Sequence, residues 1–152
     1  MTNLTLRLIP EYLRPVISLY NTQTLIDTGA IIPVISLPME KLQVRFQAEI
    51  IKENIAIGGF GGGVSQGDIY SLKNFYIRDW HFKKFECFVP RAQEKKFPIM
   101  LSASVFLDID YEFKPQNHQL ILKIPDNKMT DNEFIIKLVK DKVYIQVNGI
   151  TI

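Results

Sequence analysis

The stretch Leu25-Ile26-Asp27-Thr28-Gly29-Ala30 runs from two branched apolar residues into an acid, a hydroxyl, a glycine and an alanine. Such a run predicts a buried strand that delivers Asp27 into a tight turn, where an acid without a role would be costly to bury. Asp-Thr-Gly also makes an ordinary structural turn, in which the Asp side chain bonds its own backbone. The tripeptide alone therefore leaves a catalytic and a structural interpretation of Asp27 open.

A second unusual stretch is rich in glycine. Five of the chain's 8 glycines fall in Gly58-Gly59-Phe60-Gly61-Gly62-Gly63. Glycine lets another chain lie close against the main chain, and the alternating segments 48–57 and 69–72 on either side predict the tip of a hairpin. A phosphate-binding loop is disfavoured, because no Gly-Lys-Ser/Thr ending and no helix pattern follow. A plain flexible hairpin tip stays open as an alternative.

Apolar and polar residues alternate through much of the chain, which indicates strands with one face on a core and the other in water. A short helix is predicted over 101–107, where apolar residues recur at three- and four-residue spacing. The sequence therefore predicts a small all-β fold, either barrel-like or a sandwich. The segments predicted as strands are 4–8, 16–20, 24–26, 34–37, 44–50, 55–57, 69–77, 82–89, 119–124, 134–140 and 143–147.

The length of 152 residues suits one domain that buries its own core. After Pro125 the pattern predicts an extra hairpin, in which 134–140 pairs with the strand that begins at Val143. We therefore expect a main domain over 1–124 and a C-terminal β-hairpin extension over 125–152 that packs on the same domain.

Composition and patterning argue against several partner classes. The net charge is +2, and no basic stripe with interleaved aromatics appears, so no nucleic-acid partner is expected. No segment approaches the roughly 20 apolar residues of a membrane span, and no secretory signal pattern is seen, so we expect a soluble, cytoplasmic protein. The single cysteine, Cys87, is predicted to be a core residue. His81 and His118 lack partners at ligand spacing, so no metal site is expected.

The order of three features resembles the retropepsins, which are the retroviral-type aspartic proteases. These features are the apolar-apolar-Asp-Thr-Gly-Ala turn, the Ile-Gly-Gly-Phe-Gly-Gly tip over 57–62, and an apolar segment that runs into a short helix over 99–107. The resemblance covers residues 4–107. It implies a small closed β-barrel-like acid protease fold, and it favours the catalytic interpretation of Asp27.

Retropepsins are homodimers in which each chain supplies one Asp to a shared pair. This chain has one Asp-Thr-Gly and no Asp-Ser-Gly. The resemblance therefore implies an aspartic endopeptidase that acts as a homodimer on an extended peptide or protein substrate. Water would be activated between two Asp27 carboxylates, and no metal or organic cofactor would be needed.

The resemblance also implies roles for residues around that pair. Thr28 would bond across the two-fold axis to the partner's turn, Gly29 would offer its carbonyl to the substrate backbone, and Ala30 stands where many pepsin-like relatives have Ser. Ile32 and Met100 are candidate walls of the substrate pocket. The flap that closes over the substrate would consist of Ile57, Gly58, Gly59, Phe60, Gly61 and Gly62.

Some positions depart from the family pattern. Ile31 and Ile32 follow the turn where viral members often carry acids. Before the helix, Met100-Leu101-Ser102 stands where the family usually has an apolar pair and Gly, and Ala103 and Ser104 replace the Arg or Asp and the Asn common next. A catalytically inactive retropepsin-like dimer that binds peptides or serves as a scaffold is therefore a second interpretation. An unrelated β-barrel interaction domain is a third. The tail after Pro125 has no counterpart in the minimal viral enzyme, and we expect residues 134–152 to build the dimer interface or to cover an edge strand.

Overall fold

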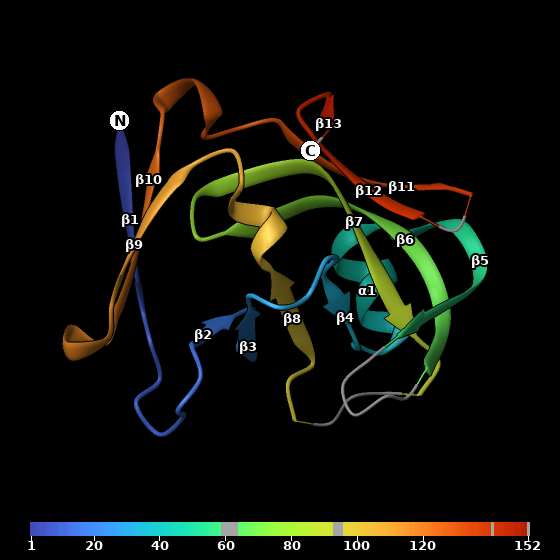
Figure 1. The fold of residues 1–152 in the computed structure, drawn as a ribbon, viewed down its shortest axis with the longest axis horizontal. Helices are drawn as coiled ribbons and strands as arrows, with labels where there is room; N and C mark the ends of the chain where they lie inside the picture. The colour runs from blue at the N-terminus through green and yellow to red at the C-terminus, as the bar shows by residue number, and fades with distance from the viewer. Residues whose placement is uncertain (59–63, 93–95, 141, 152) are drawn as a thin grey trace.

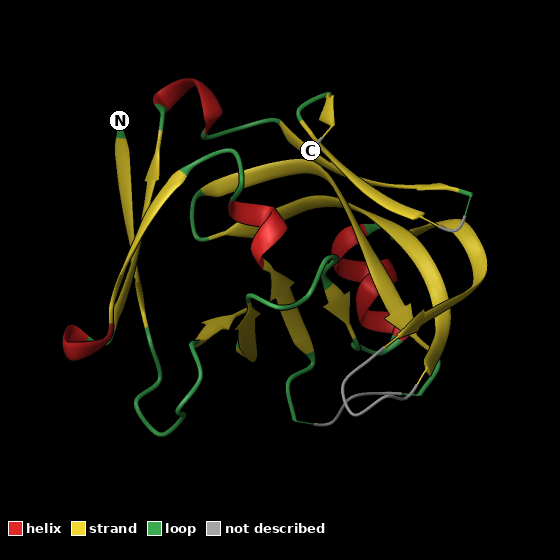
Figure 2. Ribbon diagram, viewed as in Figure 1, coloured by secondary structure: helices red, strands yellow, loops and turns green. Residues whose placement is uncertain are grey.

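A computed structural model describes the chain except for residues 59–63, 93–95, 141 and 152 (Figure 1). Strands dominate the described part, and helices are short (Figure 2), which confirms the predicted all-β class. The strands are β1 (Thr2–Arg7), β2 (Val16–Leu19), β3 (Thr22–Asp27), β4 (Val34–Ile35), β5 (Glu49–Gly58), β6 (Val64–Ile77), β7 (Trp80–Pro90), β8 (Ile99–Ser102), β9 (Asp110–Lys114), β10 (Gln119–Ile124), β11 (Asn132–Val139), β12 (Lys142–Val147) and β13 (Ile150–Thr151). The helices are α1 (Met39–Phe46) and the short 3-10 segments η2 (Ala103–Phe106), η3 (Pro115–Asn117) and η4 (Asp126–Lys128).

A three-stranded antiparallel sheet lies on one side of the molecule, in the order β1-β10-β9 (Figure 1). Leu6 in β1 lies opposite Leu120 in β10, and Leu120 lies opposite Phe113 in β9. Leu6 and Leu120 are buried. One face of this sheet therefore packs on the core, as the alternation over 4–8 predicts.

The second sheet has ten strands and contains the Asp27 stretch. β3 pairs antiparallel with β2 on one edge and parallel with β8 on the other. β8 also pairs with β4, and β4 pairs with β7. Every residue from Thr24 to Asp27 is buried, because both faces of β3 are packed: Ile26 lies in the main core and Leu25 in a second, smaller cluster.

A cluster of aromatic rings fills the core under the long hairpin of β6 and β7. Phe75 and Phe85 stack with ring centroids 4.3 Å apart, and Phe85 also contacts Phe82 at 5.4 Å and Phe134 at 5.3 Å. All four side chains are fully buried. Since Phe134 belongs to β11, the cluster joins the C-terminal strands to the main core.

The structure corrects the strand predicted over 44–50, because the first part of this segment belongs to helix α1. Leu42 and Phe46 are buried four residues apart, on one helix face, whereas Val44 is 81% exposed. Gln47 ends the helix in the left-handed conformation with φ of 48°. The alternation over 44–50 was therefore a misleading signal, and the strand β5 begins only after the helix.

The helix predicted over 101–107 is shorter than expected. Its first residues extend β8, where Leu101 lies opposite Ile26 and Ser102 lies opposite Asp27 in parallel pairing. Only η2 remains helical, as a short 3-10 segment. The parallel partner strand β3 explains the difference, because backbone pairing overrides the local spacing.

The C-terminal strands β11, β12 and β13 continue the ten-stranded sheet beyond β7. β11 runs parallel to β7, with Phe134 opposite Phe85. The Asn132 side-chain amide supports this contact by donating to the carbonyl oxygens of His81 and Lys128, each at 2.8 Å. The extension thus covers an edge of β7, which is one of the two roles expected for it.

Glu86 is a buried carboxylate where β7 meets β11. Its Oε1 accepts a hydrogen bond of 2.9 Å from the Ile136 backbone N–H, and Lys84 Nζ lies 3.8 Å from Oε2. Burial raises the pKa of Glu86, and the hydrogen bond and the lysine oppose this rise. Because its pKa is higher in the folded state, Glu86 contributes to the free energy of unfolding at pH values below its unfolded-state pKa. This contribution is lost as the pH rises through the folded-state pKa.

We therefore expect Glu86→Gln to be more stable than the wild type near neutral pH, because Gln keeps an oxygen acceptor and removes the buried charge. The difference should disappear below the ordinary Glu pKa of about 4.3. Glu86→Ala, the matched control, leaves the Ile136 N–H without its acceptor and should cost about 1–3 kcal/mol. Urea unfolding at both pH values measures these effects. A Gln variant that is less stable at neutral pH would show that the attraction to Lys84 outweighs the cost of burial.

Candidate active site

Asp27 is the last residue of β3, beside Ser102 of the parallel strand β8. The strand is fixed just before it, because the Ile26 N–H donates to the Pro15 carbonyl oxygen at 2.9 Å. The Asp27 side chain is only 3% exposed. The neighbouring strands thus hold the acid at the end of a buried strand, as the sequence predicts.

The turn after Asp27 presents the next two residues to solvent. The Gly29 N–H donates to Asp27 Oδ1 at 3.0 Å, and the Ala30 N–H donates to the Asp27 carbonyl oxygen at 3.2 Å. Thr28 and Gly29 are exposed. The bond from Gly29 is the one that a structural turn predicts, and it engages only one of the two carboxylate oxygens.

The other carboxylate oxygen of Asp27, Oδ2, is buried and accepts no hydrogen bond from any described residue. A buried oxygen of this kind costs free energy unless a proton or an outside group satisfies it. Arg14 Nη2 lies 3.7 Å from Oδ1, the carboxylate oxygen that accepts the hydrogen bond from Gly29. The carboxyl group therefore has one oxygen without a partner among the described residues, which an outside group can reach only when the atoms that cover it move aside.

Two buried serines support the turn from β8 and η2. Ser102 Oγ and Ser104 Oγ lie 2.5 Å apart, and Ser104 Oγ donates to the Ile31 carbonyl oxygen at 2.8 Å. Because a hydroxyl carries one hydrogen, Ser102 donates to Ser104. This link runs from Ser102, which lies beside Asp27, through Ser104 to Ile31, just past the turn. Ser104 thus forms a polar tie between η2 and the turn.

Replacing Ser104 by Ala should remove this tie. The change leaves the Ser102 hydroxyl and the Ile31 carbonyl without their partner, and we expect a loss of about 1–3 kcal/mol in the free energy of unfolding. Ser65→Ala on the exposed end of β6 is the control, and it should stay within about 0.5 kcal/mol of the wild type. Urea unfolding compares the two. Equal stabilities would contradict the proposed support of the turn.

Sequence reasoning did not single out Arg14 or assign a role to Ser102. Arg14 precedes β2 and lies beside Asp27 because β2 pairs with β3. Ser102 lies beside Asp27 because β8 pairs with β3. No local motif predicts that either residue contacts Asp27, since both contacts depend on strand pairing between distant segments.

The structure describes part of the predicted flap, at the end of β5. Ile57 lies opposite Ser65 and Gly58 lies opposite Val64 in β6. The hairpin predicted around the glycine-rich stretch is therefore present up to its tip. Outside the described residues lie Gly59, Phe60, Gly61 and Gly62.

The two candidate pocket walls lie in different packing clusters of the single chain. Ile32 is buried in the main core. Met100 is partly buried against a smaller cluster that contains Leu25 and Phe97. The two side chains therefore pack on different clusters of the single chain, and their contact with a substrate stays a prediction.

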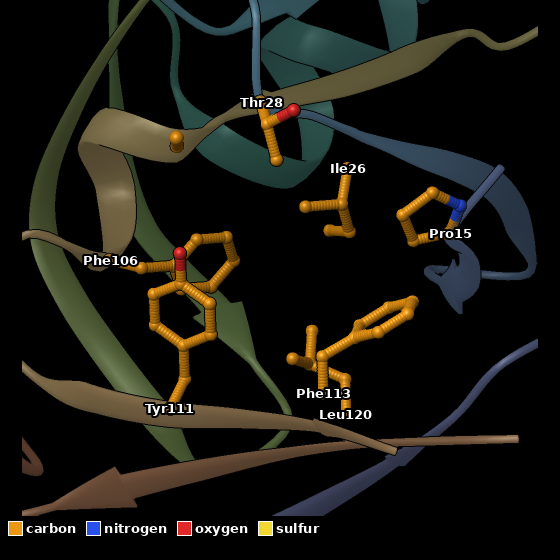
Figure 3. Close-up of a pocket in the computed structure, with 8 residues that line it drawn as sticks. Pro15, Ile26, Thr28, Phe106, Tyr111, Phe113 and Leu120 are labelled. Carbon is orange, nitrogen blue, oxygen red and sulfur yellow. The ribbon is translucent and has the colours of Figure 1, made fainter. Parts of the chain in front are cut away.

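An apolar groove of about 210 Å³ opens beside the turn (Figure 3). Thr28 and Ile26, which flank Asp27 in sequence, lie on one side of it, and the rings of Tyr111 and Phe113 lie on the other. The groove therefore extends from the Asp27 turn to the edge of the three-stranded sheet. Its lining residues are Pro15, Ile26, Thr28, Ala103, Phe106, Tyr111, Phe113 and Leu120.

Comparisons with known proteins add one informative match. No protein-family model matches the sequence, and no curated protein matches it. Among solved structures, the chain is similar to the crystal structure of a retropepsin-like aspartic protease from Rickettsia conorii, with a TM-score of 0.52. The fold is retropepsin-like. The match covers 80% of this chain and 89% of the other at 14% sequence identity, so it confirms the retropepsin-like fold that the two motifs predict.

Two further observations concern metal binding and membrane-spanning helices. Within the described ranges, no cluster of three or more His, Cys, Asp or Glu side chains could hold a metal ion. No helix among the described residues has the length and apolar character that crossing a membrane requires.

Proposed function

We propose that this chain is one half of a homodimeric aspartic endopeptidase. The observation that carries the proposal is Asp27 at the end of a buried strand in a retropepsin-like fold, with Oδ2 buried and without a donor among the described residues. A second Asp27 from an identical chain would satisfy that oxygen once the atoms that cover it move aside. Two carboxyl groups in close contact share one proton, because both cannot ionise readily; the aspartic-protease pair is the standard example of this principle.

The chemistry of such a pair needs only the two carboxyl groups and water. The ionised Asp27 accepts a proton from water while the water oxygen attacks the peptide carbonyl carbon. The protonated Asp27 of the second copy donates a hydrogen bond to the carbonyl oxygen, which becomes negatively charged. The carbon–nitrogen bond then breaks, and the amine leaves with a proton from the pair.

A dimer is required because the chain holds half of this machinery. Its sequence contains one Asp-Thr-Gly and no Asp-Ser-Gly. The exposed Thr28 at the turn is suited to bond with the partner's turn and hold the two carboxyl groups in register. In this proposal Gly29 and Ala30 complete the loop that presents Asp27.

The substrate in this proposal is an extended peptide segment. The β5–β6 hairpin, which reaches Ile57 and Gly58, would close over it and form main-chain hydrogen bonds as an added strand does. Closure excludes water and positions the bond that is cut. With Ile57, Ile32 and Met100 as side-chain contacts, we propose a preference for apolar or aromatic residues around the cleavage site.

One observation favours a second candidate, an inactive dimer that binds peptides. Asp27 is almost fully buried in the single chain, and Arg14 Nη2 lies 3.7 Å from its Oδ1. A guanidinium held beside the carboxylate competes with a second carboxyl group and with water for contact with its oxygens. If this contact persists in the dimer, binding without cleavage follows.

Incubation of the wild type and Asp27→Ala with a diverse peptide library, over a range of pH, tests the proposal. Sedimentation measures the mass of both proteins in the same buffers. Cleavage by the dimeric wild type alone supports the endopeptidase. A confirmed dimer that retains peptides without cutting them supports the inactive module, and equal cleavage by both proteins contradicts the role of Asp27.

A further inference from the structure

The strand β9 leaves an apolar face uncovered at the edge of the three-stranded sheet. Tyr111 lies opposite Leu122 and Phe113 lies opposite Leu120 in β10, so the two aromatics share a face with buried leucines. The leucines are at most 3% exposed, but Tyr111 is 49% exposed and Phe113 is 44% exposed. The apolar face therefore continues past the point where the chain's own core covers it.

β9 is also an unpaired edge. Among the described residues it pairs only with β10, in the order β1-β10-β9. An exposed edge with apolar side chains is a template for pairing with another strand. The other edge strand of the sheet, β1, offers less exposed apolar surface, because its inward Leu6 is 1% exposed.

The uncovered face lies at the place where two copies must meet. Tyr111 and Phe113 line the same groove as Ile26 and Thr28, which flank Asp27 (Figure 3). Two Asp27 carboxyl groups can share a proton only if the two turns meet at a two-fold axis. A surface that continues from the turn along β9 is therefore close to that axis.

The sequence of β9 is complementary to itself. In an antiparallel pair centred on Glu112, Asp110 of one copy lies opposite Lys114 of the other, on both sides of the axis. On the opposite face, Tyr111 of one copy lies opposite Phe113 of the other. The two Glu112 side chains repel, and lysines offset this, since Lys114 Nζ and Lys123 Nζ lie 3.7 and 3.5 Å from the Glu112 carboxylate in each chain.

We propose that β9 pairs antiparallel with β9 of a second copy, centred on Glu112, and that the partner covers the groove beside the Asp27 turn. This inference rests on the proposed function, which requires two turns to meet, and it names the surface through which they do so. It assigns the interface to β9 and not to the C-terminal residues 134–152. The two three-stranded sheets then form one continuous sheet across the dimer.

Cysteine cross-linking tests the register of this pair. Residues directly opposite in an antiparallel pair have Cα atoms about 4.5–5.5 Å apart, which a disulfide can span. Glu112→Cys should therefore form a covalent dimer when oxidised with copper phenanthroline. Asp110→Cys is the matched control on the same strand, because its two copies would lie about 13 Å apart along the pair. Cys87 is fully buried, and burial raises the pKa of its thiol, so oxidation of the wild type measures the background level of cross-linking.

Cross-linking of position 112 without position 110 supports the inference. Equal cross-linking of both positions indicates random collisions and overturns it, and so does the absence of a cross-link at 112 in a sedimenting dimer. A second test compares Tyr111→Lys with Tyr144→Lys, which places the same change on β12 of the extension, where Tyr144 is 37% exposed. We expect the dissociation constant of the dimer to rise at least about tenfold for Tyr111→Lys and to change less than about twofold for Tyr144→Lys.

These outcomes separate the interface from the proposed chemistry. Cross-linking at 112 in a protein that cleaves nothing supports the interface and contradicts the endopeptidase. Cleavage by a dimer that dissociates with Tyr144→Lys and not with Tyr111→Lys supports the endopeptidase and overturns the interface. Thermal unfolding of each variant identifies a loss of dimer that is due to misfolding. If Tyr111→Lys misfolds, the decision rests on the comparison of positions 112 and 110.

Discussion

The Asp27→Asn protein is expected to cleave peptides at least about 10³-fold more slowly than the wild type, with its fold and its dimer intact. An amide is nearly the same size as a carboxyl group, but it cannot accept a proton from the attacking water. Gly29 N–H can still donate to the side-chain oxygen that replaces Oδ1, so the turn should keep its shape. Measurement of kcat/KM on a peptide that the wild type cuts gives the loss.

The control for this substitution is Asp79→Asn, which makes the same chemical change at an exposed turn between β6 and β7. It should leave kcat/KM within about twofold of the wild type, since a surface substitution away from the site has little effect. Retention of most of the activity by Asp27→Asn would contradict the role of the carboxylate. A collapse of the fold, detected by circular dichroism, would indicate that Asp27 acts through the turn and not through chemistry.

Phe134→Ala is expected to lower the free energy of unfolding by about 3–5 kcal/mol, the largest stability effect that we predict. The ring is fully buried and stacks on Phe85 at 5.3 Å, inside the cluster that joins β11 to the main core. Truncation would leave a cavity that the surrounding strands cannot close. Denaturant unfolding, followed by the fluorescence of Trp80, measures the loss.

Tyr144→Ala in the neighbouring strand β12 is the matched control, because its side chain is 37% exposed. It should cost less than about 1 kcal/mol. If the C-terminal strands are part of the main folding unit, the wild type and both variants unfold in one transition. A separate early transition that Phe134→Ala alone removes would instead show that residues 125–152 fold as an independent unit.

The sequence was most informative where the pattern is local. Alternation identified β1 and β12, because Leu4 and Leu6 in β1 and Val143, Ile145 and Val147 in β12 are less exposed than the residues between them. The turn motif placed Asp27 at the end of a buried strand, and the structure confirms that position. The retropepsin-like fold followed from combining this turn with the glycine-rich hairpin, because each signal alone has a simpler explanation.

The sequence pattern was misleading over residues 42–46, where the spacing of apolar residues fits both a strand and a helix. Phe46 lies two residues from Val44 and four residues from Leu42, so it fits both a strand and a helix. The burial of Leu42 and Phe46 with Val44 exposed shows that the helical spacing was the correct one. A strand prediction through this segment could be rejected only with knowledge of what α1 packs against.

The contacts that support Asp27 could not be derived from local patterns. The Ser102–Ser104–Ile31 link forms because β8 brings a buried serine beside Asp27, and the same serines counted as doubtful replacements in the sequence. The exposure of the aromatic side chains of β9 could not be predicted from the sequence either. Tyr111 and Phe113 alternate with charged residues like those of a half-buried strand, and only the sheet order shows that they lie at an open edge.

Mixing wild-type and Asp27→Asn chains tests whether two chains share one active site. After subunit exchange in an equal mixture, random pairing leaves about a quarter of the dimers with two intact carboxyl groups. If the two chains share the Asp27 pair, cleavage at constant total protein falls to about a quarter of the wild-type rate. A rate that falls only to about a half would mean that each chain cuts on its own, and it would contradict the shared Asp27 pair.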